Sequence, residues 1–251
     1  MTQIGNNQHP PPSAMTSILL PTYKERDNIV ELVQAIHSQL EAQSFNYEIV
    51  IVGDNSPDGT ADAVRAAFGG DPRVQLHVRT HERGLATALR YGAEHSSGEM
   101  LVFMDTDFNH DPAVIPQMIK FLEYYDMVIG SRFVMRGGME DPTRYFFSFI
   151  YNLGLRFLFG TRVWDNLSGF FAIYRSRLFE MDMDQIFHGY GDYFIRLLMV
   201  GWRRGWRMLE VPVFYRLRKH GHSKTQFLGI FAQYTLAILK LRLTLGLGKM
   251  Q

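Results

Sequence analysis

Short apolar runs alternate with amphipathic stretches along the first half of this 251-residue chain, and this alternation constrains the fold more than any other feature. The apolar runs predict strands at 17–20, 47–52, 74–78, 100–104 and 127–129. The stretches between them have apolar residues at helical spacing and predict helices at 26–40, 59–68, 85–95 and 112–124. Such an alternation forms an open, mostly parallel sheet with helices on both faces. The sequence therefore predicts a single α/β domain of Rossmann-like architecture.

The second half of the chain is less regular and ends in a basic segment. Helices are predicted at 144–159, 191–200 and 225–243, and strands at 170–174 and 208–213. The start of the chain is polar and rich in proline, which predicts a disordered tail. The predicted organisation is a tail at 1–15, the α/β domain at 16–215, and a basic loop with an amphipathic helix at 216–251.

Composition narrows the classes of function. The formal net charge is +1, which gives no support to nucleic-acid binding. The chain has no cysteine, which excludes disulfides, thiolate zinc sites and cysteine nucleophiles and agrees with a reducing, cytoplasmic compartment. No stretch reaches the roughly 18–20 uninterrupted apolar residues of a membrane span. The start of the chain also lacks the basic and apolar regions of a signal peptide.

Two carboxylates, Asp105 and Asp107, follow the predicted strand at 100–104 directly. Residues at the carboxyl ends of parallel strands lie where such sheets bind ligands. Two carboxylates one residue apart can converge on a hard divalent cation, with phosphate oxygens completing its shell. Asn109 follows at a spacing that can add a further oxygen ligand. The alternative is a solvated turn after a strand, which the Asp-x-Asp pattern alone does not exclude.

Two other polar clusters also follow predicted strands. Asp54 comes just after the strand at 47–52 and can accept hydrogen bonds from a nucleobase or a ribose hydroxyl. The residues after it also fit a Pro-Asp-Gly turn in which Asp58 or Thr60 caps a helix. The cluster at 21–25 can equally be a helix-initiating segment, because acidic residues favour the first turn of a helix.

Several segments occur in an order that carries a family resemblance. They are SILLPTYKERDNI, EIVIVGDNSPDGT, RGLATALRYGAEHSSGEMLVFMDTDFNHDP, VIGSRF, NLSGFFAIYR and EVPVFYRLRKHGHSK. Together they resemble the inverting glycosyltransferases of family 2, which have the GT-A fold. Within that family the chain looks most like the dolichol- and polyprenol-phosphate mannose synthases. The resemblance implies a GT-A domain, a nucleotide-sugar donor, a polyprenyl phosphate acceptor, and Mg²⁺ or Mn²⁺ as cofactor.

The resemblance also implies roles for the residues on the donor side. The positions that match the lining of the nucleotide site are Pro21, Tyr23, Glu25 and Asp54. Asp105 and Asp107 match the metal-binding pair, which makes Asp107 a catalytic candidate. Asn109 stands where relatives often have a metal-coordinating Gln.

Basic residues match the groups that meet the two phosphates. Arg132, also a catalytic candidate, matches an arginine near the acceptor phosphate, and Arg144 and Ser148 match a second arginine and a serine there. Arg218 and Lys224 match a mobile basic loop that closes over the donor diphosphate. The positive charges of these side chains agree with this reading, because the donor diphosphate and the acceptor phosphate are both anionic and must be brought together. The alternative for each arginine is a solvated surface charge.

The chain departs from the family pattern at several positions. On the donor side these are Gly53, Lys24 and Ala86. On the sugar and acceptor side, Asn166 replaces an Asp, although Asp165 precedes it, and Ala172 replaces an Arg. Asp192 is expected to act as the surrogate acid that contacts sugar or acceptor, with helix N-capping as its alternative. The donor sugar and the acceptor are therefore the least constrained parts of the assignment.

Two apolar segments fit a lipid acceptor. Residues 145–151 are strongly aromatic, and 225–243 form a mostly apolar helix with a narrow polar stripe. Both are predicted to be amphipathic interface helices that attach the enzyme peripherally to the cytoplasmic face of a membrane. The alternative is burial against the catalytic core or in a homodimer. A separate membrane-anchor subunit is a further possible partner.

The leading functional hypothesis is transfer of a hexose from a nucleotide sugar, GDP-mannose or UDP-glucose, to a polyprenyl or dolichyl phosphate. One alternative is a family 2 transferase with a soluble or polysaccharide acceptor. A second alternative is a catalytically silent module that binds nucleotide sugars. A dinucleotide-dependent oxidoreductase is disfavoured, because no G-x-G-x-x-G follows the first predicted strand.

Overall fold

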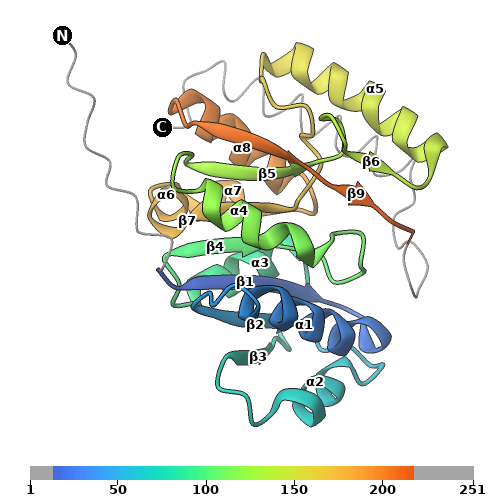
Figure 1. Ribbon diagram of the computed structural model, residues 1–251, viewed down its shortest axis with the longest axis vertical. Coiled ribbons are helices and arrows are strands. Elements are labelled where there is room, and N and C mark those ends of the chain that lie inside the picture. The colour runs from blue at the N-terminus through green and yellow to red at the C-terminus, as the bar shows by residue number, and fades with distance from the viewer. Residues whose placement is uncertain (1–13, 218–251) are drawn as a thin grey trace.

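The computed structural model describes residues 14–217, which form one seven-stranded sheet with helices on both sides (Figure 1). The strand order is β3-β2-β1-β4-β7-β5-β8. The strands are β1 (Thr16–Thr22), β2 (Tyr47–Gly53), β3 (Val74–Val78), β4 (Met100–Phe103), β5 (Met127–Ser131), β7 (Phe171–Tyr174) and β8 (Met208–Pro212). Two short strands, β6 (Gly138–Met139) and β9 (Phe214–Tyr215), pair in parallel as a separate ribbon.

Most neighbouring strands of the large sheet are parallel. Strand β1 pairs in parallel with β2 and β4, and Leu19 lies opposite both Val50 and Phe103. Strand β7 is the exception, because it runs antiparallel between β4 and β5. The predicted mostly parallel sheet is therefore confirmed. The carboxyl ends of β1, β2 and β4 lie at the same edge of the sheet, where a ligand can reach them.

The helices connect these strands. They are α1 (Arg26–Glu41), α2 (Thr60–Phe68), α3 (Leu85–Glu94), α4 (Ile115–Phe121), α5 (Pro142–Phe159), α6 (Arg175–Phe179), α7 (Met183–Ile186) and α8 (Tyr193–Arg203), with a 3₁₀ turn, η1 (Pro112–Val114), before α4. Figure 1 shows α1 and α4 in front of the sheet and α3, α7 and α8 behind it. No helix within residues 14–217 is long and apolar enough to cross a membrane.

Alternate residues of each strand bury into opposite layers of the core. In β1, Ile18 and Leu20 pack with α1 and α4 in one cluster. Leu19 of the same strand packs with α3 and α8 in the other cluster. Because strand side chains alternate between the two faces of a sheet, a continuous apolar run buries both faces at once. The prediction of helices on both faces is confirmed.

The structure adds detail that the sequence pattern did not predict. The predicted helix at 112–124 is split: it begins as η1, capped by the Asp111 carboxylate, and continues as α4. The elements β6, β9, α6 and α7 were not predicted, because segments of two to five residues carry no periodic signal. The predicted helix at 225–243, and all but a few residues of the predicted tail (1–15) and C-terminal region (216–251), lie outside the described residues. Those predictions stay untested.

Candidate active site

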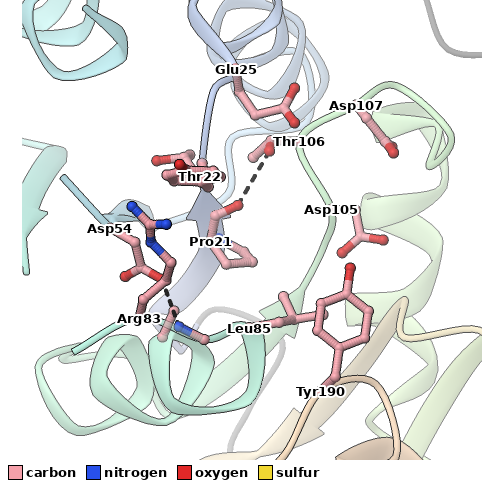
Figure 2. A pocket seen from close by; sticks show the side chains of 13 residues that line it. Pro21, Thr22, Glu25, Asp54, Arg83, Leu85, Asp105, Thr106, Asp107 and Tyr190 are labelled. Atoms are coloured by element: carbon pink, nitrogen blue, oxygen red, sulfur yellow. Dashed lines mark hydrogen bonds between the residues drawn. The ribbon is translucent and has the colours of Figure 1, made fainter. Parts of the chain in front are cut away.

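A pocket of about 550 Å³ opens at the carboxyl ends of β1, β2 and β4. Its lining consists of Pro21, Thr22, Tyr23, Glu25, Asp54, Arg83, Gly84, Leu85, Ala88, Asp105, Thr106, Asp107 and Tyr190. Figure 2 shows most of these side chains around the opening. The structure thus brings together all the predicted nucleotide residues that it describes and both predicted metal carboxylates. The segments that follow β1, β2 and β4 are far apart in sequence, and they meet here because these three strands end at one edge of the sheet.

Asp54 enters the pocket with its carboxylate already engaged. It accepts hydrogen bonds from Arg79 Nε at 2.8 Å and from the backbone N–H of Gly84 at 2.9 Å. Both Asp54 and Arg79 are buried. The ion pair therefore ties the end of β2 to the loop that precedes α3. A nucleotide contact by Asp54 remains a prediction, and it would add to these bonds.

An aromatic and cationic wall lines the same pocket. The Arg83 guanidinium lies 4.2 Å from the centroid of the Tyr23 ring, within the range of a cation–π contact. Arg83 was not predicted as a site residue, although it begins the Arg-Gly-Leu segment that carries part of the family resemblance. A flat cationic surface of this kind suits a nucleobase or a phosphate.

Asp105 and Asp107 follow β4 in the sequence, but their side chains have different surroundings. Asp105 is half-buried, whereas Asp107 is buried. Asp107 accepts hydrogen bonds from Asn109, through the backbone N–H at 3.1 Å and through Nδ2 at 2.9 Å. The Thr106 hydroxyl donates to the Pro21 carbonyl at 3.2 Å (Figure 2). This bond holds the loop after β4, which carries both carboxylates, against the end of β1.

These carboxylates suit a hard divalent cation that is shared with a ligand. Within residues 14–217, no group of three or more Asp, Glu or His side chains is close enough to enclose a metal. Asp105 and Asp107 would supply only part of the oxygen shell of such a cation, and phosphate and water would complete it. Asn109 directs its Nδ2 toward Asp107, so its predicted role as a metal ligand rests on its other side-chain atom, the amide oxygen.

Arg132 lies in a buried ion pair. Its Nε and Nη2 donate to the two carboxylate oxygens of Asp165 at 2.7 and 2.6 Å, and its backbone N–H donates to the same group. Arg132 is 5% exposed and Asp165 is fully buried. The backbone N–H of Asp165 donates to Glu210, whose own pKa is raised by burial. The predicted contact with the acceptor phosphate stays a prediction. The Arg132 guanidinium already has the Asp165 carboxylate as its partner.

The other predicted acceptor residues lie on α5, outside the lining of the pocket. Arg144 and Ser148 share one face of this helix, as their spacing predicted. Ser148 is buried and Arg144 is half-buried. The structure therefore gathers the donor side of the predicted site into one pocket, but it does not bring the predicted acceptor residues into that pocket. Arg218 and Lys224 lie outside the described residues.

Asp192 occupies the N-cap position of α8, yet its side chain makes no capping hydrogen bond there. Its carboxylate instead accepts the backbone N–H of Tyr190 at 3.0 Å and pairs with Arg196. Figure 2 shows the Tyr190 ring directed into the pocket, with its hydroxyl toward Asp105. Asp192 thus supports the loop that presents Tyr190, a pocket residue that the sequence did not single out. Its predicted contact with sugar or acceptor stays a prediction.

Two departures from the family pattern have structural explanations. The Asn166 side chain bonds the Thr161 hydroxyl at 3.1 Å and the Val163 carbonyl at 3.0 Å, so it closes its own loop. Ala172 lies in the middle of β7, between β4 and β5, and is fully buried. A larger charged side chain at this position would have to enter the core.

Comparison with known proteins identifies the family. The sequence profile described as "Glycosyl transferase family 2" matches residues 17–181. The chain therefore belongs to glycosyl transferase family 2, and the prediction of a glycosyltransferase is confirmed at this level.

Two relatives are named for lipid-phosphate acceptors. One is a dolichol-phosphate mannosyltransferase of Pyrococcus furiosus, 34% identical over 221 residues that cover 86% of this chain and 60% of the relative. The other is an undecaprenyl-phosphate mannosyltransferase of Micrococcus luteus, 32% identical over 213 residues that cover 82% of this chain and 85% of the relative. The chain thus spans less than two thirds of the length of the Pyrococcus relative.

A solved structure confirms the fold. The glucosyl-3-phosphoglycerate synthase of Mycobacterium tuberculosis, in complex with Mn²⁺, UDP and phosphoglyceric acid, superposes with a TM-score of 0.70. The match covers 91% of this chain and 78% of that chain at 20% sequence identity. At this identity the likeness shows the fold alone, and it confirms the predicted GT-A architecture.

Proposed function

We propose that this chain transfers a hexose from a nucleoside diphosphate sugar to a polyprenyl phosphate, with a divalent cation bound at Asp105 and Asp107. The observation that carries the proposal is the pocket itself, which gathers the predicted nucleotide residues beside two carboxylates at one sheet edge. The names of the relatives support mannose as the sugar and a lipid phosphate as the acceptor. We favour GDP-mannose over UDP-glucose on that ground.

In the proposed reaction, an acceptor phosphate oxygen forms a bond to the anomeric carbon as the bond from that carbon to the donor diphosphate breaks, with inversion. A phosphate monoester is largely ionised near neutral pH, so this nucleophile needs no strong general base. A bound divalent cation supplies charge stabilisation for the departing diphosphate. The work of the protein is then to orient the donor between Tyr23, Asp54 and the Asp105 loop and to exclude competing water.

The acceptor is tested by following the sugar into a lipid fraction. With GDP-[¹⁴C]mannose, undecaprenyl phosphate and Mg²⁺ or Mn²⁺, we expect labelled product in the organic phase. Parallel reactions with UDP-[¹⁴C]glucose determine the donor, and parallel reactions with 3-phosphoglycerate test the soluble-acceptor alternative. Label that stays in the aqueous phase for every donor would contradict the lipid acceptor. Label in phosphoglycerate alone would favour the alternative.

The outer face of α5 supports a peripheral position on a membrane. Phe146, Ile150, Leu153 and Phe157 are exposed and lie three or four residues apart, so they form one stripe along the helix. Phe157 is 90% exposed. The opposite side of α5 packs inward, since Asn152 and Leu155 are buried there. An exposed apolar stripe on one helix is typical of an interaction surface, and a lipid acceptor makes the cytoplasmic face of a bilayer its proposed partner.

We expect the triple variant Phe146→Ser, Ile150→Ser, Phe157→Ser to bind vesicles of phosphatidylcholine and phosphatidylglycerol at least about 10-fold more weakly, because each side chain loses apolar area to insert. Vesicle co-sedimentation measures this effect. The matched control replaces Tyr124 and Phe179, which are also exposed but lie away from α5, with serine. Equal binding by wild type and triple variant, with a loss of dimer in sedimentation, would favour a homodimer interface instead.

A further inference from the structure

A buried hydrogen-bonded chain connects the Asp105 loop to strand β9. The backbone N–H of Asp105 donates to His110 Nδ1 at 3.0 Å. His110 Nε2 lies 2.8 Å from the Tyr215 hydroxyl, and that hydroxyl lies 2.9 Å from the Ser168 carbonyl. Tyr215 is 105 positions beyond His110 in the sequence. The loop that carries both candidate metal carboxylates is therefore fastened to a strand from the far end of the described chain.

The direction of each bond in this chain is fixed by its end groups. A backbone N–H can only donate, so Nδ1 of His110 must accept and the ring proton lies on Nε2. Nε2–H then donates to the Tyr215 oxygen. The Tyr215 hydroxyl in turn donates to the Ser168 carbonyl, which can only accept. One tautomer of a neutral His110 satisfies every group.

The surroundings hold this tautomer in place. His110 is 1% exposed and stacks on Phe170, with ring centroids 4.8 Å apart and planes 11° apart. The Arg132 guanidinium lies 4.7 Å from the centroid of the Tyr215 ring. The imidazole thus stacks on Phe170 and meets the Tyr215 ring in a T-shaped contact, which holds it as a fixed spacer.

We propose that His110 and Tyr215 are positioning residues, which set the orientation of Asp105 toward the cation and donor diphosphate by fastening its backbone to β9. Neither side chain lines the pocket, so they act through Asp105. The inference rests on the proposed function, because it assigns a cation to Asp105 and Asp107. Groups that orient a metal ligand typically change metal affinity by about 10–100-fold when they are replaced.

The test replaces the tyrosine hydroxyl alone. Tyr215→Phe keeps the ring under Arg132 and removes the bonds to His110 and to the Ser168 carbonyl. Tyr174→Phe is the matched control, because the Tyr174 hydroxyl is also buried and donates to the Leu122 carbonyl at 2.6 Å, away from the pocket. Both variants lose a buried hydroxyl that donates to a carbonyl, so both are expected to lower the Tm by a few degrees, roughly 2–8 °C.

Mn²⁺ binding separates the two variants. In electron paramagnetic resonance titrations with GDP or UDP present, we expect Tyr215→Phe to weaken Mn²⁺ binding about 10-fold or more, and Tyr174→Phe to leave it unchanged. His110→Asn, which can still accept from Asp105 but cannot reach Tyr215, is expected to weaken it as well. Wild-type affinity in Tyr215→Phe or in His110→Asn would overturn the inference while leaving the proposed function intact. Failure of the wild type to bind Mn²⁺ would overturn the cation site and, with it, this inference.

Discussion

Replacing Asp107 with alanine is expected to lower the rate of sugar transfer by at least about 100-fold and to abolish measurable Mn²⁺ binding. Asp107 is one of the two carboxylates proposed to hold the cation, and no group of three or more Asp, Glu or His side chains in residues 14–217 forms an alternative metal site. Its position is fixed by the two hydrogen bonds from Asn109. The measurement is the transfer assay, with Mn²⁺ titrated by electron paramagnetic resonance.

A second variant separates the effect of the Asp107 charge from the effect of its hydrogen bonds. Asp107→Asn keeps an oxygen that can accept from Asn109 but removes the negative charge. If the carboxylate binds a cation, Asn and Ala variants should lose transfer to a similar extent. If Asp107 only organises the turn, the Asn variant should retain most activity. Asp62→Asn, on the exposed surface of α2, is the control for loss of one charge. Transfer that survives Asp107→Ala would contradict the metal role.

The residues at the donor side could be predicted because a simple rule places them. Asp54 and Asp105 each come directly after a buried strand, and parallel strands end at one edge of a sheet. The alternation of apolar runs therefore fixes both the layers of the fold and the location of the pocket. Within residues 14–217, helix and strand boundaries differ from prediction by a few residues only, since the long strands and helices have clear periodicity.

The contacts between distant segments could not be predicted. Nothing near His110 in the sequence indicates that Tyr215 is its partner, and β9 is too short to show a pattern. Tyr190 reaches the pocket through a loop between α7 and α8, and its position depends on Asp192 and Arg196. A motif assigns a residue type to a role, but it does not show whether that side chain is already paired.

Arg132 is the residue for which it matters most whether the side chain is already paired. Arg132→Ala is expected to lower the free energy of unfolding by about 3–5 kcal/mol, because it leaves the Asp165 carboxylate buried without its partner. For a chain of this size the loss corresponds to a fall in Tm of roughly 6–20 °C. Thermal unfolding of the purified variant measures it. A Tm within about 2 °C of the wild type would contradict a structural ion pair.

Loss of activity in Arg132→Ala would not by itself assign a role, since a destabilised protein also loses activity. The double variant Arg132→Met, Asp165→Asn removes both charges together, and replacing a buried pair in this way often restores stability. The amide oxygen that Asp165→Asn introduces can still accept the backbone N–H of residue 132, which the Asp165 carboxylate accepts in the wild type. If the double variant regains both Tm and transfer, the ion pair is structural. If it regains Tm but transfer stays at least about 100-fold below wild type, with an unchanged Kd for the nucleotide, the Arg132 guanidinium acts on the acceptor phosphate, as the family resemblance implies.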